Sequence, residues 1–253
     1  VKKSYLFIYV LDFSYPIEEI SHRLDTSSSG LILTDSRYPV LEPLKIDKLN
    51  INSHMNSKTN EAYAVKSDGS PALILFTSGT TGKPKGVVHS FEGLNEQLSD
   101  LQEAWNMSSN DELFLTLPLN HIHGLITGMF NGLFAGAGVT LHSQFDAQLA
   151  WNRLSNSKTS FFTAVPAIYS KLYQHFRSKK PSNIDHLRLM ISGSSSLSES
   201  LLNAWGNDVR RAGIIERYGM TETGMIATNA IDAPLATCVG KPISSVEIKI
   251  DTT

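Results

Sequence analysis

Residues 72–86 read Ala72-Leu-Ile-Leu-Phe-Thr-Ser-Gly-Thr-Thr-Gly-Lys-Pro-Lys-Gly86, and this stretch decides the fold class. Its first five residues form a short apolar run, which predicts a buried strand. The ten residues that follow combine glycines with hydroxyl and lysine side chains, a composition that lets backbone amides converge on an anion. The turn is not a Walker loop, because Gly79 and Gly82 are too close together and Lys83 precedes a proline. It predicts an anion-binding turn, with a flexible surface loop as the alternative.

Strand and helix patterns alternate on both sides of this stretch. Apolar runs predict strands at residues 5–11, 31–34, 113–117, 160–165 and 187–191 and from 214 onward. Helices are predicted from residue 14, across 94–105, from 166 and from 199, where Ser196-Leu-Ser-Glu199 fits a capping box, and residues 50–70 are predicted to be a loop. This order predicts an α/β fold with largely parallel sheets flanked by helices. Ligands of such sheets bind at the carboxyl ends of the strands.

Composition excludes several classes of protein. The 253 residues include 22 basic and 24 acidic side chains, a formal net charge of −2, which offers no general field for nucleic acid or an anionic membrane. Apolar residues make up 41% and charged residues 18%, so the chain can bury a core and is too apolar for disorder. The length allows one large domain or two modest ones. A single cysteine, Cys238, favours a reducing intracellular compartment, mitochondrial or cytoplasmic.

Two segments have some features of targeting or membrane sequences. Residues 1–11 pair a basic start with an apolar run, but Asp12 ends that run after seven residues, so a core strand is favoured over a signal peptide. Residues 124–141 carry no charge and space glycines every four residues. Their many glycines and the lack of aromatic or basic flanks favour a buried helix over a membrane span.

Three further turns carry residues suited to chemistry. Pro118-Leu-Asn-His-Ile-His-Gly124 follows a predicted strand, and its two histidines could suggest a metal site, although no matching Cys or carboxylate set accompanies them. Ser192-Gly-Ser-Ser-Ser-Leu197 and Glu216-Arg-Tyr-Gly-Met-Thr-Glu222 each follow another predicted strand. Taken alone, Tyr218 and Glu222 would be an ordinary core aromatic and a solvated acid.

These four motifs, in this order, resemble those of the adenylate-forming superfamily, which includes acyl-CoA synthetases, luciferases and peptide-synthetase adenylation domains. The resemblance runs from about residue 15 to the last residue. It implies that the chain is part of the large N-terminal domain of such an enzyme, a partial AMP-binding domain over residues 1–253. The start of that domain and the C-terminal mobile domain, with its adenylation lysine, are expected to be absent from these residues.

The resemblance also implies roles for individual residues. The β- and γ-phosphates of ATP would be held by Thr77, Ser78, Gly79, Thr80, Thr81 and Gly82, with Lys85 neutralising the pyrophosphate. His121 and His123 would line the acyl pocket, and Gly193, Ser194 and Ser195 would lie against adenine. The adenylate-binding motif comprises Glu216, Arg217, Tyr218, Gly219, Met220, Thr221 and Glu222, in which Tyr218 would stack on adenine, Thr221 would bond the α-phosphate and Glu222 would hold Mg²⁺.

The activity implied is ATP-dependent ligation of a small carboxylic acid to CoA through an acyl-adenylate, with ATP, Mg²⁺ and CoA required. Two alternatives remain: transfer of the acyl group to another acceptor, and a truncated, non-catalytic nucleotide-binding module. Among acyl-CoA synthetases the motifs most resemble those of malonyl-CoA synthetases. Arg217 could then hold the second carboxylate of malonate, because a guanidinium bonds a carboxylate at two points. A structural salt bridge, with Glu216 or a neighbouring strand, is the alternative role for this arginine.

Overall fold

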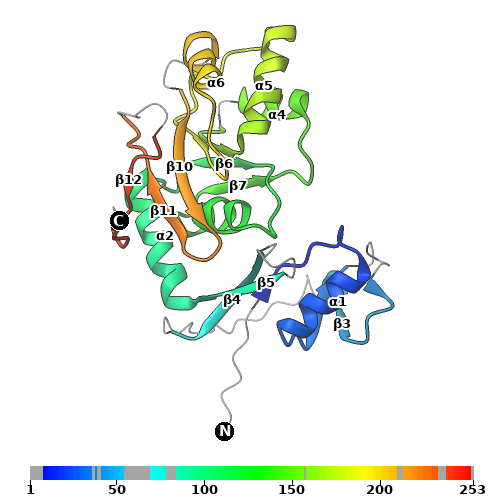
Figure 1. The fold of residues 1–253 in the computed structure, drawn as a ribbon. Coiled ribbons are helices and arrows are strands. Elements are labelled where there is room, and N and C mark those ends of the chain that lie inside the picture. Colours follow the sequence, from blue (N-terminus) through cyan, green and yellow to red (C-terminus); the bar gives the residue numbers. More distant parts are fainter. Residues whose placement is uncertain are drawn as a thin grey trace. The chain divides into compact units, whose positions relative to one another are not determined.

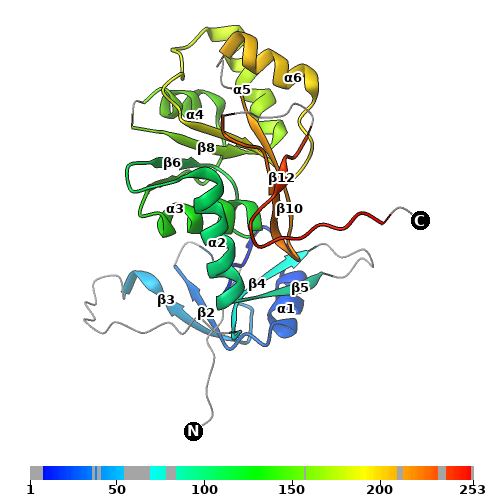
Figure 2. The ribbon, with the colours of Figure 1, turned by 90° about the vertical axis from the view of Figure 1, so that its left-hand side faces the viewer.

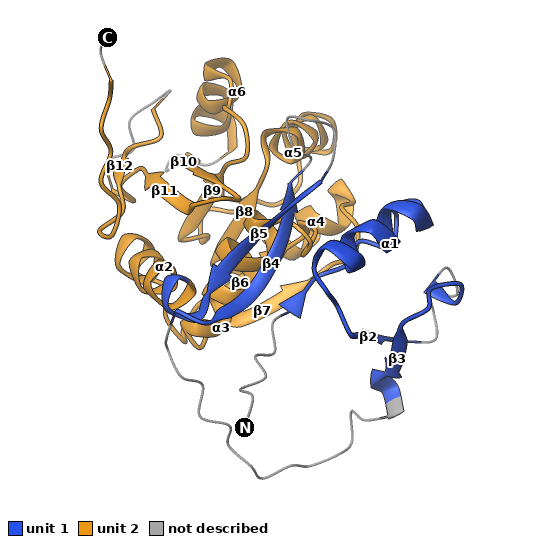
Figure 3. Cartoon of the chain, turned by 60° about the horizontal axis from the view of Figure 1, so that its bottom comes forward, with its two compact units in different colours: residues 1–93 blue, residues 94–253 orange. Residues whose placement is uncertain are grey.

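The computed structural model describes residues 8–35, 38, 41–53, 69–77, 84–156, 158–209, 213–232 and 238–251. Within these ranges the chain is an α/β protein, as the sequence predicts. It divides into two compact units, residues 1–93 and 94–253, which are coloured separately in Figure 3.

Unit 1 contains two small sheets and a helix. Its elements, coloured blue to cyan in Figure 1, are β1 (Ile8–Tyr9), α1 (Ile17–Thr26), β2 (Leu31–Thr34), β3 (Asp47–Asn50), the 3₁₀ turn η2 (Ile51–Ser53), β4 (Pro71–Thr77) and β5 (Lys85–Ser90). The strands pair as β1-β4-β5 and β2-β3. Ile20 and Leu24 of α1 pack with Ile32 and Leu41 in a small apolar core. Strand β4 is almost wholly buried, as its apolar sequence requires.

Unit 2 is built on a seven-stranded sheet in the order β12-β11-β10-β9-β8-β6-β7. Its strands are β6 (Glu112–Leu115), β7 (Gly138–Leu141), β8 (Phe161–Ala164), β9 (Leu189–Ser192), β10 (Ile215–Met220), β11 (Gly224–Thr228) and β12 (Lys241–Pro242). The five strands from β7 to β10 are parallel, whereas β11 and β12 are antiparallel additions at one edge. The predicted parallel character therefore holds for most of this sheet, but the whole sheet is mixed.

Helices cover both faces of the seven-stranded sheet. They are α2 (Phe91–Trp105, which begins at the unit boundary), the π-helix η3 (His123–Phe130), α3 (Asn131–Phe134), α4 (Ala147–Leu154), α5 (Pro166–Lys179), α6 (Glu199–Ala204) and the π-helix η4 (Trp205–Val209). Trp105 of α2 contacts Phe161, whereas Tyr169 of α5 contacts Phe162. Because adjacent strand residues point to opposite faces, α2 and α5 lie on opposite faces of the sheet (Figure 2).

The uncharged stretch 124–141 is not one helix, contrary to the prediction. It forms most of η3, then α3, and then strand β7. Gly136 ends the helical part with φ of +71°, a left-handed conformation that glycine adopts without strain, and β-branched Val139 and Thr140 follow in the strand. Within the ranges that the structure describes, no helix combines the length and apolar character needed to cross a membrane.

Three smaller predictions need correction. The cap of α6 is Ser198, whose hydroxyl accepts from the Leu201 amide, and not Ser196; a cap two residues later allows Leu197 to be buried before the helix begins. The predicted loop 50–70 starts with the end of β3 and with η2, while residues 54–68 lie outside the described ranges. The predicted first strand is described only as β1, because residues 1–7 also lie outside them.

Candidate functional site

The glycine-rich turn joins two antiparallel strands of unit 1. Thr77, the last residue of β4, is the register partner of Lys85, the first residue of β5. This hairpin places a hydroxyl and an exposed ammonium side by side at the base of the turn. Five of the predicted phosphate-binding residues lie outside the described part of the chain: Ser78, Gly79, Thr80, Thr81 and Gly82.

The serine-rich turn and the adenylate-binding motif meet in unit 2. Ser192 of β9 is the register partner of Glu216 of β10, and the Glu216 carboxylate accepts a 2.9 Å hydrogen bond from the Leu197 amide. Gly193 lies against Arg217: a β-carbon at Gly193 would come within 2.3 Å of the guanidinium Nε. The serine-rich turn and the adenylate-binding motif, about twenty residues apart in the sequence, are therefore in contact at both ends of that turn.

His123 joins a third motif to this pair. It is 4% exposed, and its Nδ1 lies 3.0 Å from the Ser194 hydroxyl and its Nε2 2.8 Å from the Thr163 hydroxyl. Ser194 and Ser195 themselves are exposed, and Ser194 has φ of +72°, a strained conformation for serine. His121 is also exposed, so of the two predicted histidines only His123 enters the cluster.

Arg217 is the main charge of this cluster. It is 4% exposed, and its Nε and Nη2 find no hydrogen-bond acceptor among the described residues. None of the ion pairs in that part of the chain includes Arg217, so the structure gives no support to the alternative structural salt bridge. Burial lowers the pKa of Arg217 from its ordinary value to about 10, and the side chain remains protonated at neutral pH.

The pKa of His123 is set by its burial and by the neighbouring Arg217. Burial first, and then the positive charge of Arg217, hold the pKa of His123 well below its usual 6.5. The imidazole is therefore neutral at physiological pH, with one nitrogen donating and the other accepting a hydrogen bond. The cluster also holds the buried Glu216 carboxylate, which accepts from the Leu197 amide, but no ion pair among the described residues joins it to Arg217. The guanidinium is therefore free to bind an anionic ligand.

The adenylate-binding motif lies mostly on a strand, and not after one as predicted. Residues 216–220 belong to β10, because they continue to pair with the antiparallel strand β11. Only Thr221 and Glu222 lie in the hairpin turn, where Glu222 is exposed. Tyr218 is 47% exposed, so its ring is available to a stacking partner. Gly219 cannot carry a side chain, since a β-carbon there would come within 2.5 Å of the Gly224 oxygen.

The described residues fit a metal ion that takes only one or two ligands from the protein. Among the described residues no three His, Cys, Asp or Glu side chains gather in a way that could hold a metal. Glu222 offers one exposed carboxylate in a turn. Mg²⁺ in nucleotide-dependent enzymes uses one or two protein carboxylates and completes its shell with phosphate oxygens and water. A single exposed carboxylate is compatible with an ion whose other ligands come from a nucleotide and water, and not with a dedicated metal cage.

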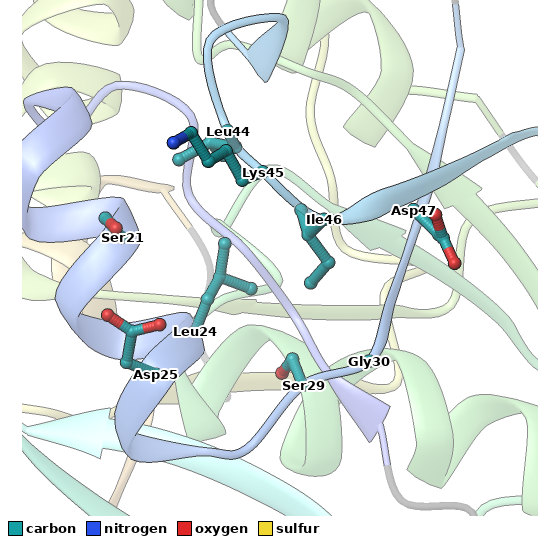
Figure 4. Close-up of a pocket in the computed structure, with 9 residues that line it drawn as sticks. All are labelled: Ser21, Leu24, Asp25, Ser29, Gly30, Leu44, Lys45, Ile46 and Asp47. Atoms are coloured by element: carbon teal, nitrogen blue, oxygen red, sulfur yellow. The ribbon is translucent and has the colours of Figure 1, made fainter.

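A separate hollow of about 610 Å³ lies in unit 1, between α1 and the start of β3 (Figure 4). It is lined by Ser21, Leu24, Asp25, Ser29, Gly30, Leu44, Lys45, Ile46 and Asp47. None of these was predicted as a site residue, and none belongs to the four motifs.

The sequence analysis did not identify two buried polar residues near the candidate site, Thr163 and Gln97. Thr163 is fully buried on β8, within the apolar run Phe161-Phe-Thr-Ala-Val165, so a polar residue in a core strand was the available signal. Gln97 is buried on α2, at a position where the spacing of Leu94, Leu98 and Leu101 calls for an apolar residue.

Comparison with known proteins identifies the class. A sequence profile described as AMP-binding enzyme matches residues 4–253, and the chain belongs to this family. The fold agrees: 89% of the chain superposes with a TM-score of 0.81 on a structure titled malonyl-CoA ligase ternary product complex with methylmalonyl-CoA and AMP bound, at 31% identity and covering 49% of that chain.

Individual relatives are similarly named. The chain is 32% identical over 275 residues to malonate–CoA ligase of Arabidopsis thaliana, with 95% of this chain and 45% of the relative covered. It is 31% identical over 268 residues to a mitochondrial malonate–CoA ligase of Xenopus laevis, covering 94% of this chain and 46% of the relative. The chain thus spans about half the length of the curated relatives it matches.

Proposed function

We propose that the intact protein is an ATP-dependent acid–CoA ligase that activates a short dicarboxylic acid, such as malonate, as an acyl-adenylate. Membership of the AMP-binding enzyme family supports the reaction class. The names of the relatives, malonate–CoA ligases at about 30% identity, support CoA as the acceptor and malonate as the acid. The mitochondrial label of some relatives supports a mitochondrial location, with the cytoplasm as the alternative.

The residues of the chain suit the nucleotide half of this reaction. Thr77 and Lys85 flank the glycine-rich turn, which would hold the β- and γ-phosphates through Ser78, Gly79, Thr80, Thr81 and Gly82. The half-exposed ring of Tyr218 is the candidate platform for adenine. Thr221 and Glu222 follow in the hairpin turn, as candidates for the α-phosphate and for Mg²⁺. When bound, the ion would neutralise phosphate charge.

The observation that carries the choice of acid is the buried guanidinium of Arg217, whose Nε and Nη2 have no hydrogen-bond acceptor in the described part of the chain. Keeping a charge buried without a counter-ion destabilises the folded protein, so such a group is retained where a ligand supplies the counter-ion. A monocarboxylate loses its charge when it becomes an acyl-adenylate. A dicarboxylate keeps one carboxylate, which Arg217 would hold through Nε and Nη2.

His123 has a complementary part in this proposal. Because it is neutral and already bonded to Thr163 and Ser194, it adds no positive charge of its own, and the charge offered to the carboxylate is that of Arg217. It instead forms an uncharged wall of the acid pocket and fixes the serine-rich turn. His121, being exposed, is the weaker candidate for a pocket residue.

The test is product analysis with the intact protein, ATP, Mg²⁺, CoA and a panel of acetate, propionate, malonate, methylmalonate and succinate. Mass spectrometry should detect malonyl-CoA as the main thioester. An adenylate without any thioester would indicate a different acyl acceptor. Nucleotide binding by calorimetry with neither product would indicate a non-catalytic module, and either result would overturn the proposal.

A further inference from the structure

Helix α2 holds the β10–β11 hairpin at two separate points. The indole Nε1 of Trp105 donates to the Thr228 hydroxyl at 3.0 Å, near the end of β11. Eight residues earlier on the helix, the Gln97 side-chain amide faces the hairpin turn, with its Nε2 3.4 Å from the Thr223 carbonyl oxygen. Figures 1 and 2 both show α2 running beside this hairpin. The helix therefore supports the turn that carries Thr221 and Glu222.

The turn is tight and has no room to shift toward the helix. The Thr223 amide donates to the Met220 carbonyl, which closes a four-residue turn, and Gly224 follows with φ of +80°. A β-carbon at Gly224 would lie 1.5 Å from Nε2 of Gln97. The Gln97 amide thus occupies the space that a side chain at Gly224 would need, and the backbone of the turn packs against this amide.

Ordinary core packing does not account for a glutamine at this place. Gln97 is 8% exposed, and its Oε1 is buried with no hydrogen-bond donor among the described residues. A buried, unsatisfied carbonyl is destabilising, so an apolar side chain of the same size would suit stability better. The hydrogen bond to the Thr223 oxygen, at 3.4 Å, lies at the long end of the range for an N–H···O bond, so it does not offset the cost of burying Oε1.

We propose that Gln97 is a positioning residue for the nucleotide and its Mg²⁺, acting through the backbone of the 220–224 turn. By bonding the Thr223 carbonyl and filling the space beneath Gly224, it fixes the direction in which the neighbouring Thr221 hydroxyl and Glu222 carboxylate point. A misplacement of about 1 Å in such groups is sufficient to reduce catalysis strongly. This inference rests on the proposed function, because it assigns Thr221 and Glu222 to the nucleotide.

The decisive variant is Gln97→Met, which keeps the length and volume of the side chain but removes the amide. Gln102→Ala is the control: Gln102 lies on the same helix, and its amide bonds the main-chain oxygen of Asn131 instead of the turn. The measurement is the Mg²⁺ concentration that gives half-maximal malonate-dependent ATP–pyrophosphate exchange by the intact protein. Loss of one neutral hydrogen bond should raise it about 3- to 10-fold in Gln97→Met and leave it unchanged in Gln102→Ala.

A merely structural role predicts a different pattern. Gln97→Met would then change the melting temperature, and the amount of active protein, without moving the Mg²⁺ requirement. An unchanged Mg²⁺ half-saturation in Gln97→Met, or an equal rise in Gln102→Ala, overturns the proposal.

A double variant tests the contact itself. Gly224→Ala should be strongly impaired, since its methyl group would strike the Gln97 amide and the φ angle would be strained. Adding Gln97→Ala removes the first of these two problems, so the double variant should be no more impaired than Gly224→Ala. Losses that simply add would show that the two residues do not act through each other, which contradicts the proposal.

Failure of the proposed function would be recognised separately. If the wild-type protein activates no acid, the ligase proposal is wrong, and Gln97 is then judged by calorimetric binding of Mg²⁺ with a non-hydrolysable ATP analogue. Weaker binding by Gln97→Met than by Gln102→Ala supports the positioning role. Equal binding, or no binding by the wild-type protein, overturns it.

Discussion

Replacing Arg217 by methionine should make the protein more stable and at the same time less able to use a dicarboxylic acid. Burial lowers the pKa of Arg217 from its ordinary value to about 10, so holding the charge inside the folded protein is unfavourable by about 3 kcal/mol. Methionine keeps an unbranched side chain of similar length and carries no charge. The free energy of unfolding at neutral pH should therefore rise by up to about 3 kcal/mol, a melting temperature up to about 6 to 12 °C higher.

Activity should move in the opposite direction, and only for one class of acid. A charge-assisted hydrogen bond contributes about 1.5–3 kcal/mol, so kcat/KM for malonate should fall by about 10- to 150-fold. For propionate, which has no second carboxylate, kcat/KM should change little. Chemical denaturation and initial rates of pyrophosphate release on the same preparations give both quantities.

The opposite pattern would refute this reasoning. Breaking a buried ion pair destabilises a protein by about 3–5 kcal/mol, so a large loss of stability in Arg217→Met would mean that the guanidinium has a protein partner. Equal losses of kcat/KM for malonate and propionate would mean that Arg217 serves the nucleotide or the fold. Either result would remove the physical basis for a dicarboxylate.

Three further predictions concern single groups. The pKa of His123 in the folded state lies well below the 6.5 of the unfolded chain, so below about pH 6.5 the unfolded state takes up a proton that the folded state does not. The contribution of neutral, buried His123 to the unfolding free energy is therefore complete above about pH 6.5 and declines below it. The unfolding free energy of the wild-type protein should fall by about 1.4 kcal/mol more than that of His123→Gln between pH 7.5 and 5.5; parallel curves would contradict this. Lys85→Ala should lower ATP–pyrophosphate exchange with little change in melting temperature, since Lys85 is exposed, and undiminished exchange would exclude the hairpin from phosphate binding. Glu222→Gln keeps the size of the side chain but removes the charge, so the Mg²⁺ requirement should rise; a normal requirement would mean that Glu222 is not a ligand.

The sequence was most informative where local patterns and topology agree. The apolar run at 72–76, the Pro166 helix start and the strands at 161–164 and 189–192 lie where the patterns predict them. It was less informative about residues 124–141, because the absence of charge does not distinguish a buried helix from a buried strand. Gly136, with its positive φ, separates the helical part of that stretch from the strand. Because glycines recur every four residues there, the sequence did not indicate which of them ends the helix.

Motif resemblance named the residues of the candidate site but not their arrangement. It pointed to His123, Gly193 and Arg217, and the structure adds that Gly193 lies against Arg217 and that the Arg217 charge lowers the pKa of His123. Thr163 could not be recognised as a partner of His123, since the contact depends on which face of β8 the residue occupies. The position of the Arg217 charge against Gly193 likewise depends on the pairing of β9 with β10, which no local pattern specifies.

We propose that the intact protein adenylates a short dicarboxylic acid. ATP–pyrophosphate exchange in the absence of CoA measures this step alone. This reaction requires only the nucleotide, Mg²⁺ and the acid, and is independent of the final acyl acceptor. We expect saturable exchange with malonate, and a kcat/KM for malonate at least tenfold above that for propionate. The absence of exchange with any acid of the panel, by folded protein that binds ATP, would contradict it.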